Sequence, residues 1–188
     1  MAQQGLLVHT VRTLDQAGIE YMITGSIVTS LQGEPRSTHD IDVVVQISAA
    51  EVPRLIEAFP RPKYYVDEDT IREAILLGGT FNVIDTEEGD KVDFWMLHDE
   101  PFDRSRFSRK YREKLFGVNM TVSSPEDTIL AKLRWAKLSH GSERHVRDVL
   151  GVYEVQRPHL DERYLDEWAE QLGVADLLGQ VREQASGG

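Results

Sequence analysis

The chain has 188 residues, of which 40% are hydrophobic, and its 21 basic and 32 acidic side chains give a formal net charge of −11 at pH 7. This length and composition indicate a globular protein of one domain, or of one domain with a small appendage, and the absence of cysteine excludes disulfides, thiolate metal sites and catalytic thiols. The negative charge makes duplex DNA an unfavourable partner, because tight binding of a polyanion usually needs a basic face.

The N-terminal segment has neither the basic start nor the apolar run of a signal peptide, and the apolar runs of the sequence are too short to span a bilayer. We therefore expect a cytoplasmic protein. Apolar residues at helical spacing predict a first helix that ends near Gly18. The following elements alternate, with strands expected at 21–23, 40–47, 64–66, 81–84, 92–97 and 116–122, and helices at 27–32, 48–59 and 70–77.

Three of these elements have distinctive local signals. The strand that begins at Asp40 is nearly continuous in β-branched residues, which indicates that both of its faces are covered. Ser48 is expected to cap the helix that follows. Residues 87–90 predict a hairpin-like turn between two strands.

The C-terminal third is expected to be helical. Ser124 is a capping residue, Pro125 suits the first helical position, and Glu126 and Asp127 place acids in the first turn. Further helices are expected at 143–152, 161–172 and 175–184. The sequence therefore predicts an α/β core over residues 1–122 and a helical extension over residues 123–188 that packs on the core.

The main candidate site is a set of carboxylates. Asp40 and Asp42 alternate with Ile41 along a strand, so both carboxylates share one face. Two adjacent like charges there are costly unless a cation lies between them, and Mg²⁺ prefers oxygen ligands. Asp93 interrupts another apolar strand. If that strand lies beside the first, three carboxylates converge and can hold two metal ions about 3.5–4 Å apart. By itself an Asp-x-Asp pair is more often a turn or a solvated strand edge.

Gly25 and Ser26 precede the acidic pair and are candidates for binding phosphate. A glycine permits close backbone approach, and the helix expected to follow it presents free N–H groups to an anion. A lone Gly-Ser pair is usually only a loop. The order of strand, Gly-Ser, helix, Asp-x-Asp strand and later Asp strand is what favours a functional site.

The segments Ile23–Ser26 and Arg36–Val43 resemble the opening motif of the DNA polymerase β-like nucleotidyltransferase superfamily, which is a glycine with glycine or serine followed by an acidic pair. Gly33, Arg36 and Thr38 resemble a minimal bacterial branch of uncharacterised nucleotidyltransferases that is similar to the toxin subunit of type IV abortive-infection systems. In the helical part, Ser124–Asp127, Lys132, Ser142–Arg144 and Arg147–Asp148 resemble the segment after the core in such small proteins. Residues between Leu160 and Val174 resemble a tail shared by one group of hypothetical proteins.

The resemblance implies a nucleotidyltransferase fold of the α/β (α+β) class, with a mixed, partly antiparallel sheet and helices mainly on one side. It also implies transfer of a nucleoside monophosphate from a nucleoside triphosphate to an acceptor hydroxyl, with release of pyrophosphate. Two Mg²⁺ or Mn²⁺ ions would be held by Asp40 and Asp42, and Asp93 would bind the catalytic ion and help to deprotonate the acceptor. The β and γ phosphates would lie on Gly25 and Ser26. Lys132 and Arg36 are weaker candidates for phosphate contact.

Other side chains have competing interpretations. Lys132 lies beside an apolar helical stripe, where a lysine more often extends from a buried face than binds a ligand. His98 is a candidate metal ligand or a surface histidine. The basic segment 104–114, with its interleaved aromatic residues, is interpreted as a solvated helix in preference to an RNA-binding surface. Tryptophans are expected in the core or between helices, at Trp95, Trp135 and Trp168.

The sequence leaves the acceptor open among tRNA, protein and small molecules. Two alternative functions also stay open. The first is an interaction protein of the toxin–antitoxin type with a cognate antitoxin-like partner. The second is a scaffold that binds nucleotide without turnover.

Overall fold

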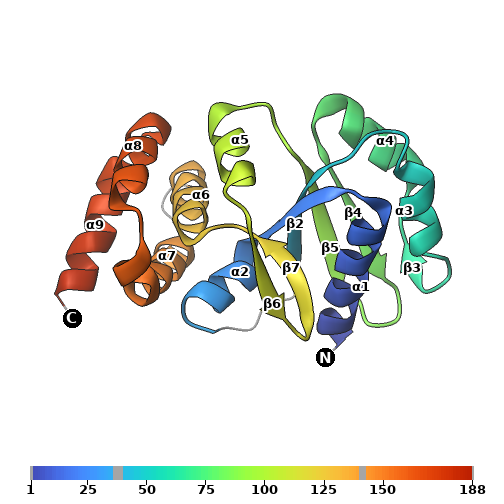
Figure 1. The fold of residues 1–188 in the computed structure, drawn as a ribbon, viewed down its shortest axis with the longest axis horizontal. Coiled ribbons are helices and arrows are strands. Elements are labelled where there is room, and N and C mark those ends of the chain that lie inside the picture. Colours follow the sequence, from blue (N-terminus) through green and yellow to red (C-terminus); the bar gives the residue numbers. More distant parts are fainter. Residues whose placement is uncertain (1, 36–39, 140–142, 188) are drawn as a thin grey trace. The chain divides into compact units, whose positions relative to one another are not determined.

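The computed structural model describes residues 2–35, 40–139 and 143–187. The chain divides into two compact units, of which the first comprises Met1–Ile27 and Thr38–Val122 and the second Val28–Ser37 and Ser123–Gly188. The first unit contains a β-sheet with helices, and the second is helical (Figure 1). Residues 28–35 thus belong to the second unit, although the strands β1 and β2 before and after them in the sequence belong to the first.

The strands of the first unit are β1 (Glu20–Thr24), β2 (Asp40–Gln46), β3 (Tyr64–Tyr65), β4 (Thr80–Asp85), β5 (Lys91–Met96), β6 (Tyr111–Leu115) and β7 (Val118–Val122). Within the described residues they form one seven-stranded sheet in the order β3-β4-β5-β2-β1-β7-β6. The pairs β2–β5 and β1–β7 are parallel, and the other neighbouring pairs are antiparallel. The predicted mixed sheet is confirmed, and β2 lies at its centre.

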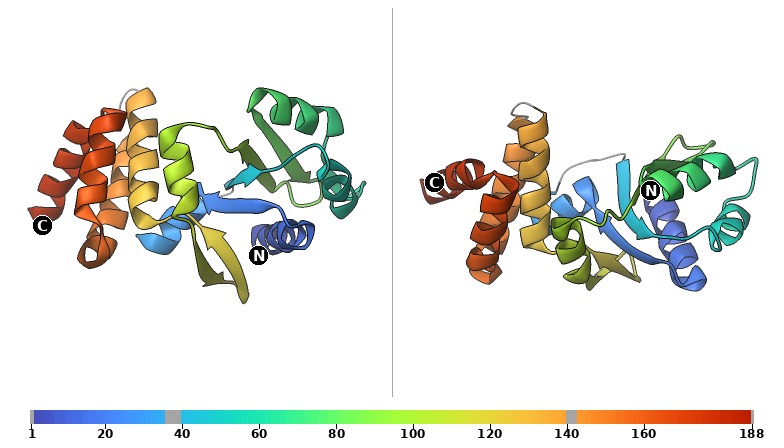
Figure 2. Two further views of the ribbon diagram at one scale, coloured as in Figure 1. Left: turned by 45° about the horizontal axis from the view of Figure 1, so that its top comes forward. Right: turned by 90° about the horizontal axis from the view of Figure 1, so that it is seen from above.

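Helices cover the two faces of the sheet unequally. The helices of the first unit are α1 (Ala2–Ala17), α3 (Val52–Ala58), α4 (Glu68–Leu77) and α5 (Pro101–Ser108), and α2 (Gly25–Gln32) begins in it. On one face, α1 contacts α3, and α3 contacts α4 (Figure 2). On the other face, Phe107 of α5 packs with Met22 and Val44. The part of that face beyond α5 carries the candidate site.

The core of the first unit follows from strand alternation. Ile41, Val43 and Val45 of β2 point to the face that α1 covers, and all three are buried. Val44 points to the other face and is buried there by Phe107, so the β-branched run is covered on both sides as predicted. On β4 and β5, the rings of Phe81 and Phe94 stack with centroids 4.7 Å apart.

Two local predictions in the first unit were wrong. Ser48 does not cap α3, whose N-cap is Glu51; instead the Ser48 N–H and Oγ donate to the Glu51 carboxylate, at 2.8 and 2.6 Å. The strand expected from residue 116 begins at Val118, because Phe116 and Gly117 adopt positive φ angles of 49° and 78° and form the turn of the β6–β7 hairpin.

The basic segment 104–114 is also organised differently from the prediction of one solvated helix. α5 ends at Ser108, and β6 begins at Tyr111 and pairs with β7. The inward packing of aromatic residues was correct for Phe102 and Phe107, which are buried, but Phe116 is half exposed. Residues 111–115 form a strand because they pair with β7, and the composition of the segment does not predict this pairing.

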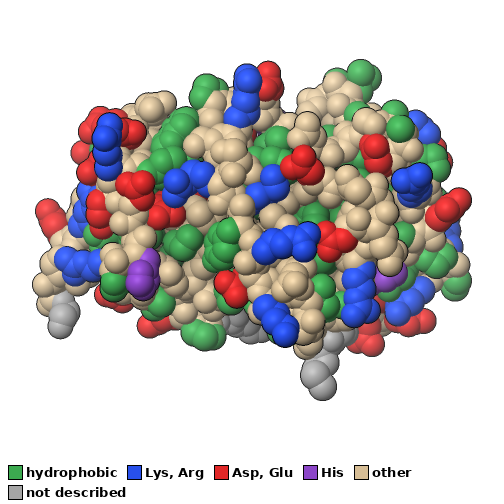
Figure 3. Space-filling model, in the orientation of Figure 1, with side chains coloured by type: hydrophobic (Ala, Val, Ile, Leu, Met, Phe, Trp, Pro, Cys, Tyr) green, Lys and Arg blue, Asp and Glu red, His purple; other side chains and the backbone are tan. Residues whose placement is uncertain are grey.

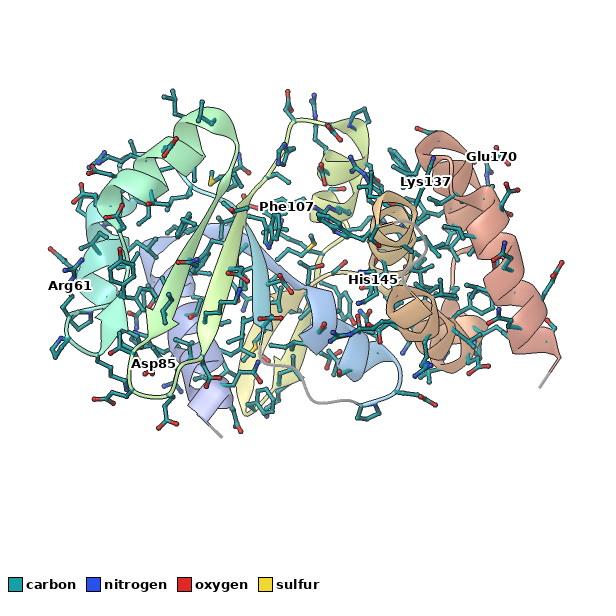
Figure 4. The ribbon with its side chains drawn as sticks, turned by 180° about the vertical axis from the view of Figure 1, so that it is seen from behind. Arg61, Asp85, Phe107, Lys137, His145 and Glu170 are labelled. Atoms are coloured by element: carbon teal, nitrogen blue, oxygen red, sulfur yellow. The ribbon has the colours of Figure 1, made fainter. Side chains whose placement is uncertain are left out.

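The second unit consists of α6 (Pro125–Leu138), α7 (Glu143–Gln156), the 3₁₀ turn η1 (Arg157–His159), α8 (Glu162–Leu172) and α9 (Ala175–Ser186), with the end of α2. α6 contacts α7 and α8, and α9 contacts α7 and α8. Figure 4 labels Lys137 on α6, whose Nζ donates to the carbonyl oxygen of Gly173 at 2.9 Å, just beyond the end of α8.

The predicted start of α6 is confirmed and is also part of the unit's core. Ser124 Oγ accepts a hydrogen bond from the Asp127 N–H at 3.2 Å and donates to Asp127 Oδ2 at 2.6 Å. Asp127 is fully buried, and its other oxygen accepts from the hydroxyl of Tyr164 on α8 at 2.7 Å. Glu126 accepts from the Asp161 N–H at 2.9 Å. The acids of this first turn therefore tie α6 to the start of α8.

Among the described residues, no helix is long and apolar enough to cross a membrane.

Phe94→Ala should lower the free energy of unfolding by about 3–5 kcal/mol, because it removes a fully buried ring and leaves a cavity at the centre of the sheet. Urea denaturation followed by circular dichroism measures the loss. Leu76→Ala is the control, since Leu76 is 83% exposed and should change stability by less than about 0.5 kcal/mol. Equal effects of the two substitutions would contradict this core.

Tyr164→Phe should destabilise the second unit by about 1–3 kcal/mol, because the buried Asp127 carboxylate loses a donor and gains no water in exchange. Thermal unfolding measures the change. The neighbouring Arg163→Ala removes only an exposed ion pair with Glu167 and should cost less than about 0.5 kcal/mol. A Tyr164 variant as stable as the Arg163 variant would argue against the network.

Candidate active site

The parallel register of β2 and β5 brings together the acids that the sequence separates. Asp42 lies opposite Asp93, and Asp40 lies opposite Lys91. Register partners on neighbouring strands point to the same face, so these four side chains share the face opposite α1. In Figure 4 this face is turned toward the viewer, with α1 behind the sheet. The expectation that the Asp93 strand lies beside the Asp40 strand is confirmed.

The row that contains Asp42 and Asp93 is polar across four strands. Thr24 of β1 lies opposite Asp42, and Asn82 of β4 lies opposite Asp93. Neighbouring strands are about 4.8 Å apart, so these side chains form a continuous band. The band is partly exposed, with Asn82 the most accessible of the row.

Gly25 lies directly on the Asp42 carboxylate. A Cβ built on Gly25 would be 2.1 Å from Asp42 Oδ2, and its φ of +70° is a conformation that other residues rarely adopt. Both observations require glycine at this position. Gly25 is also the first residue of α2, so the partial positive charge of the helix N-terminus is next to a carboxylate, where it favours negative charge. Ser26 follows it in the first turn.

Trp95 fixes one side of Asp42. Its indole Nε1 donates to Asp42 Oδ1 at 3.3 Å, while its ring packs against the cluster of Met22, Val44 and Phe107 beneath α5. Figure 4 labels Phe107 at this position beside the strands. The sequence interpretation of Trp95 as a packing residue is therefore only half of its role, because the indole N–H also orients a site carboxylate.

Lys91 is a site residue that the sequence interpretation missed. Its Nζ donates to Asp93 Oδ2 at 2.7 Å and lies 3.9 Å from Asp40 Oδ1. The hydrogen bond to Asp93 raises the pKa of Lys91, and the charges of Asp93, Asp40 and Asp42 act in the same direction against the cost of burial. Lys91 therefore stays charged at neutral pH. The sequence signal that could have identified Lys91 is its spacing, because Lys91, Asp93 and Trp95 lie at every second position of β5 and so share one face.

The remaining candidate residues lie elsewhere. Lys132 belongs to the second unit, where its Nζ is 2.8 Å from Asp148 Oδ2 and both side chains are buried. Arg36 lies outside the described residues. His98 is exposed after β5. Within residues 2–35, 40–139 and 143–187, no group of three or more His, Cys, Asp and Glu side chains is arranged to hold a metal ion. In the first unit, Lys91 instead contacts two of the three acids.

Acids of the first unit pair with basic side chains of the 104–114 cluster. Figure 3 shows Lys and Arg side chains over α5 and the β6–β7 hairpin, with Asp and Glu side chains among them. The ion pairs join Arg104 to Asp99, Arg106 to Asp103, Lys110 to Glu20 and Arg112 to Asp15. This pairing lowers the positive potential of the surface and supports the preference against an RNA-binding face.

No protein-family model matches the sequence, and no curated protein sequence matches it. Solved structures do resemble the chain. An antigenic nucleotidyltransferase-like protein from Paracoccidioides brasiliensis matches with a TM-score of 0.57 and 14% identity, over 96% of this chain and 92% of that chain. ANT(2'')-Ia in complex with adenylyl-2''-tobramycin matches with a TM-score of 0.57 and 14% identity, over 98% and 99%.

A third similar structure is the lincosamide antibiotic adenylyltransferase LnuA with lincomycin bound, with a TM-score of 0.50 and 12% identity, over 79% of this chain and 95% of that chain. All three match the chain at 12–14% sequence identity, so the likeness concerns the fold. The chain has the nucleotidyltransferase fold, as the resemblance in its sequence predicts.

Proposed function

We propose that this protein is a metal-dependent nucleotidyltransferase that moves a nucleoside monophosphate from a nucleoside triphosphate to an acceptor hydroxyl and releases pyrophosphate. The observation that carries the proposal is the register of β2 and β5, which sets Asp42 opposite Asp93 beside the N-terminus of α2. The nucleotidyltransferase fold of the chain supports it.

The donor set suits Mg²⁺ or Mn²⁺. Asp40, Asp42 and Asp93 offer hard carboxylate oxygens on one face, and the position of the Lys91 ammonium between Asp93 and Asp40 indicates that these oxygens attract a cation. In the proposal, Asp40 and Asp42 hold two ions and Asp93 shares the catalytic one. When bound, the ions neutralise phosphate charge and activate the acceptor hydroxyl. Trp95 keeps Asp42 oriented, because its indole N–H donates a hydrogen bond to Asp42 Oδ1.

The phosphates of the nucleotide would lie at the start of α2. Gly25 allows a ligand to approach the backbone, and the N–H groups of the first turn with the Ser26 hydroxyl would donate to the β and γ phosphates. Arg36 and Lys132 remain candidates for phosphate contact. For Lys132 the buried ion pair with Asp148 supplies a structural role that competes with ligand binding.

A small molecule is the acceptor that the charge of the chain favours. The net charge of −11 and the pairing of the basic cluster with acids both disfavour a polyanionic acceptor such as tRNA. Two structural neighbours point the same way, since one is in complex with adenylyl-2''-tobramycin and the other is a lincosamide antibiotic adenylyltransferase. We therefore place small hydroxyl compounds ahead of tRNA and protein.

Nucleoside triphosphates labelled at the α-phosphate, incubated with Mg²⁺ and a panel of aminoglycosides, lincosamides, tRNA and protein, should transfer label to one acceptor class. Asp42→Asn and Asp93→Asn should each reduce the rate by about 100-fold or more, because charge at the reacting phosphate is no longer neutralised. The control is Asp99→Asn, whose carboxylate pairs with Arg104 at the surface. Folded wild-type protein that transfers no label to any acceptor would overturn the proposal, and nucleotide binding without transfer would favour the scaffold.

Gly25→Ala should weaken the binding of Mg²⁺–ATP by about 10-fold or more, because the added methyl group forces the Asp42 carboxylate out of place. Isothermal titration calorimetry measures the affinity. Gly89→Ala is matched, since Gly89 has a similar φ of +77° but an added methyl group there would meet nothing within 4 Å. Both substitutions should cost about 1–2 kcal/mol of stability through the backbone. Only Gly25→Ala should lose affinity, so equal affinities would argue against Mg²⁺–ATP binding at Asp42 and the start of α2.

A further inference from the structure

Lys91 contacts two of the carboxylates of the proposed metal site. Its ammonium is 2.7 Å from Asp93 Oδ2 and 3.9 Å from Asp40 Oδ1, and Asp42 lies in the next row of the same face. Lys91 lies on β5 opposite Asp40 and two positions before Asp93. The strand pairing that gathers the carboxylates therefore also brings a positive charge to them.

The carboxylates need this charge when no metal is bound. Three like charges on neighbouring rows repel one another, and the Asp93 side chain is only 20% exposed, which weakens screening by water and salt. The Asp93 oxygen that accepts from Lys91 has a lone pair committed to the ammonium. Mg²⁺ binds oxygen ligands at about 2.0–2.1 Å, so an ion on the Asp93 carboxylate would lie close to the ammonium and the two positive charges would repel each other.

We propose that Lys91 is the resident counter-cation of the metal-free site, and that binding of a divalent ion displaces it from Asp93 and Asp40. The proposal rests on the proposed function, since it concerns the same three carboxylates. Lys91 then acts as a positioning residue. It holds the carboxylates together before the ion binds, and it opposes binding of the ion alone.

The exposure of Lys91 makes such a displacement feasible. Its side chain is 42% exposed, so the ammonium reaches water by rotating about its own bonds and leaves no buried cavity. An ion that arrives with a nucleotide also brings the negative charge of the phosphates, which compensates the displaced ammonium. The site is thus expected to bind the metal–nucleotide complex in preference to the free metal.

The test compares Mn²⁺ binding to the full-length protein without nucleotide, measured by electron paramagnetic resonance of the free ion. Lys91→Met should bind Mn²⁺ on the order of 10-fold more tightly than the wild type, because a charge that opposes the ion is gone. Lys110→Met is the matched control. Lys110 pairs with Glu20 at 3.0 Å in the same unit, so this variant has the same net charge and should keep the wild-type affinity.

A second pair of readouts separates a counter-cation from a merely structural residue. Lys91→Arg keeps the positive charge and should keep the wild-type Mn²⁺ affinity. In EDTA, Lys91→Met should melt at a lower temperature than Lys110→Met, and Mg²⁺ should remove the difference, because the ion then replaces the missing charge.

Two results would overturn the inference, and they differ. If Asp93→Asn abolishes Mn²⁺ binding but Lys91→Met and Lys110→Met bind equally well, Lys91 is not the counter-cation and the proposed function stands. If Mn²⁺ binding does not depend on Asp93 in either the wild type or Lys91→Met, the metal site of the proposed function fails together with the role of Lys91.

Discussion

The parallel pairing of β2 with β5 is the constraint on which the candidate site depends. The chain between the two strands passes through α3, β3, α4 and β4 before it returns beside β2. Because β5 then pairs in register, Asp42 faces Asp93 and Asp40 faces Lys91. A shift of one residue would turn the side chains of β5 to the opposite face and place its charges against α1. The apolar alternation of Val92, Phe94 and Met96 with these polar residues opposes such a shift, because it would bring buried apolar side chains to the site face.

The site places several carboxylates on one face of the sheet, and neighbouring groups offset the electrostatic cost of doing so. Like carboxylates on one face repel each other, and each neighbour reduces the penalty in a different way. Lys91 supplies a full positive charge, Trp95 donates a hydrogen bond, and the N-terminus of α2 supplies a partial charge through Gly25. Such a local conflict within a well-packed sheet is typical of functional sites. The same arrangement explains why a divalent cation and its phosphates are the ligands that we propose for this face.

The second unit uses buried polar groups for a different purpose. Asp127 is fully buried but bonded to Ser124 and Tyr164, and Lys132 is paired with Asp148 between α6 and α7. Buried charges of this kind are destabilising without partners, so they select one arrangement of the helices. The helix caps of α6 and α8 are thus part of the packing of this unit. A buried polar residue here is explained by structure before any ligand is invoked.

The sequence by itself determined the elements with strong local signals: the β-branched run of β2, the capped start of α6 and the Asp-x-Asp spacing, which sets two carboxylates on one strand face. It failed for the Ser48 cap and for the segment 104–117, because the bonding partner of Ser48 and the strand that pairs with β6 were not local signals. Only the tertiary structure decided that Asp93 joins Asp42, that Trp95 and Lys91 contact the acids, and that Lys132 pairs with Asp148. The reason is physical: alternation along one strand assigns a face to each side chain, whereas the neighbours on that face depend on which strands pair and in which register.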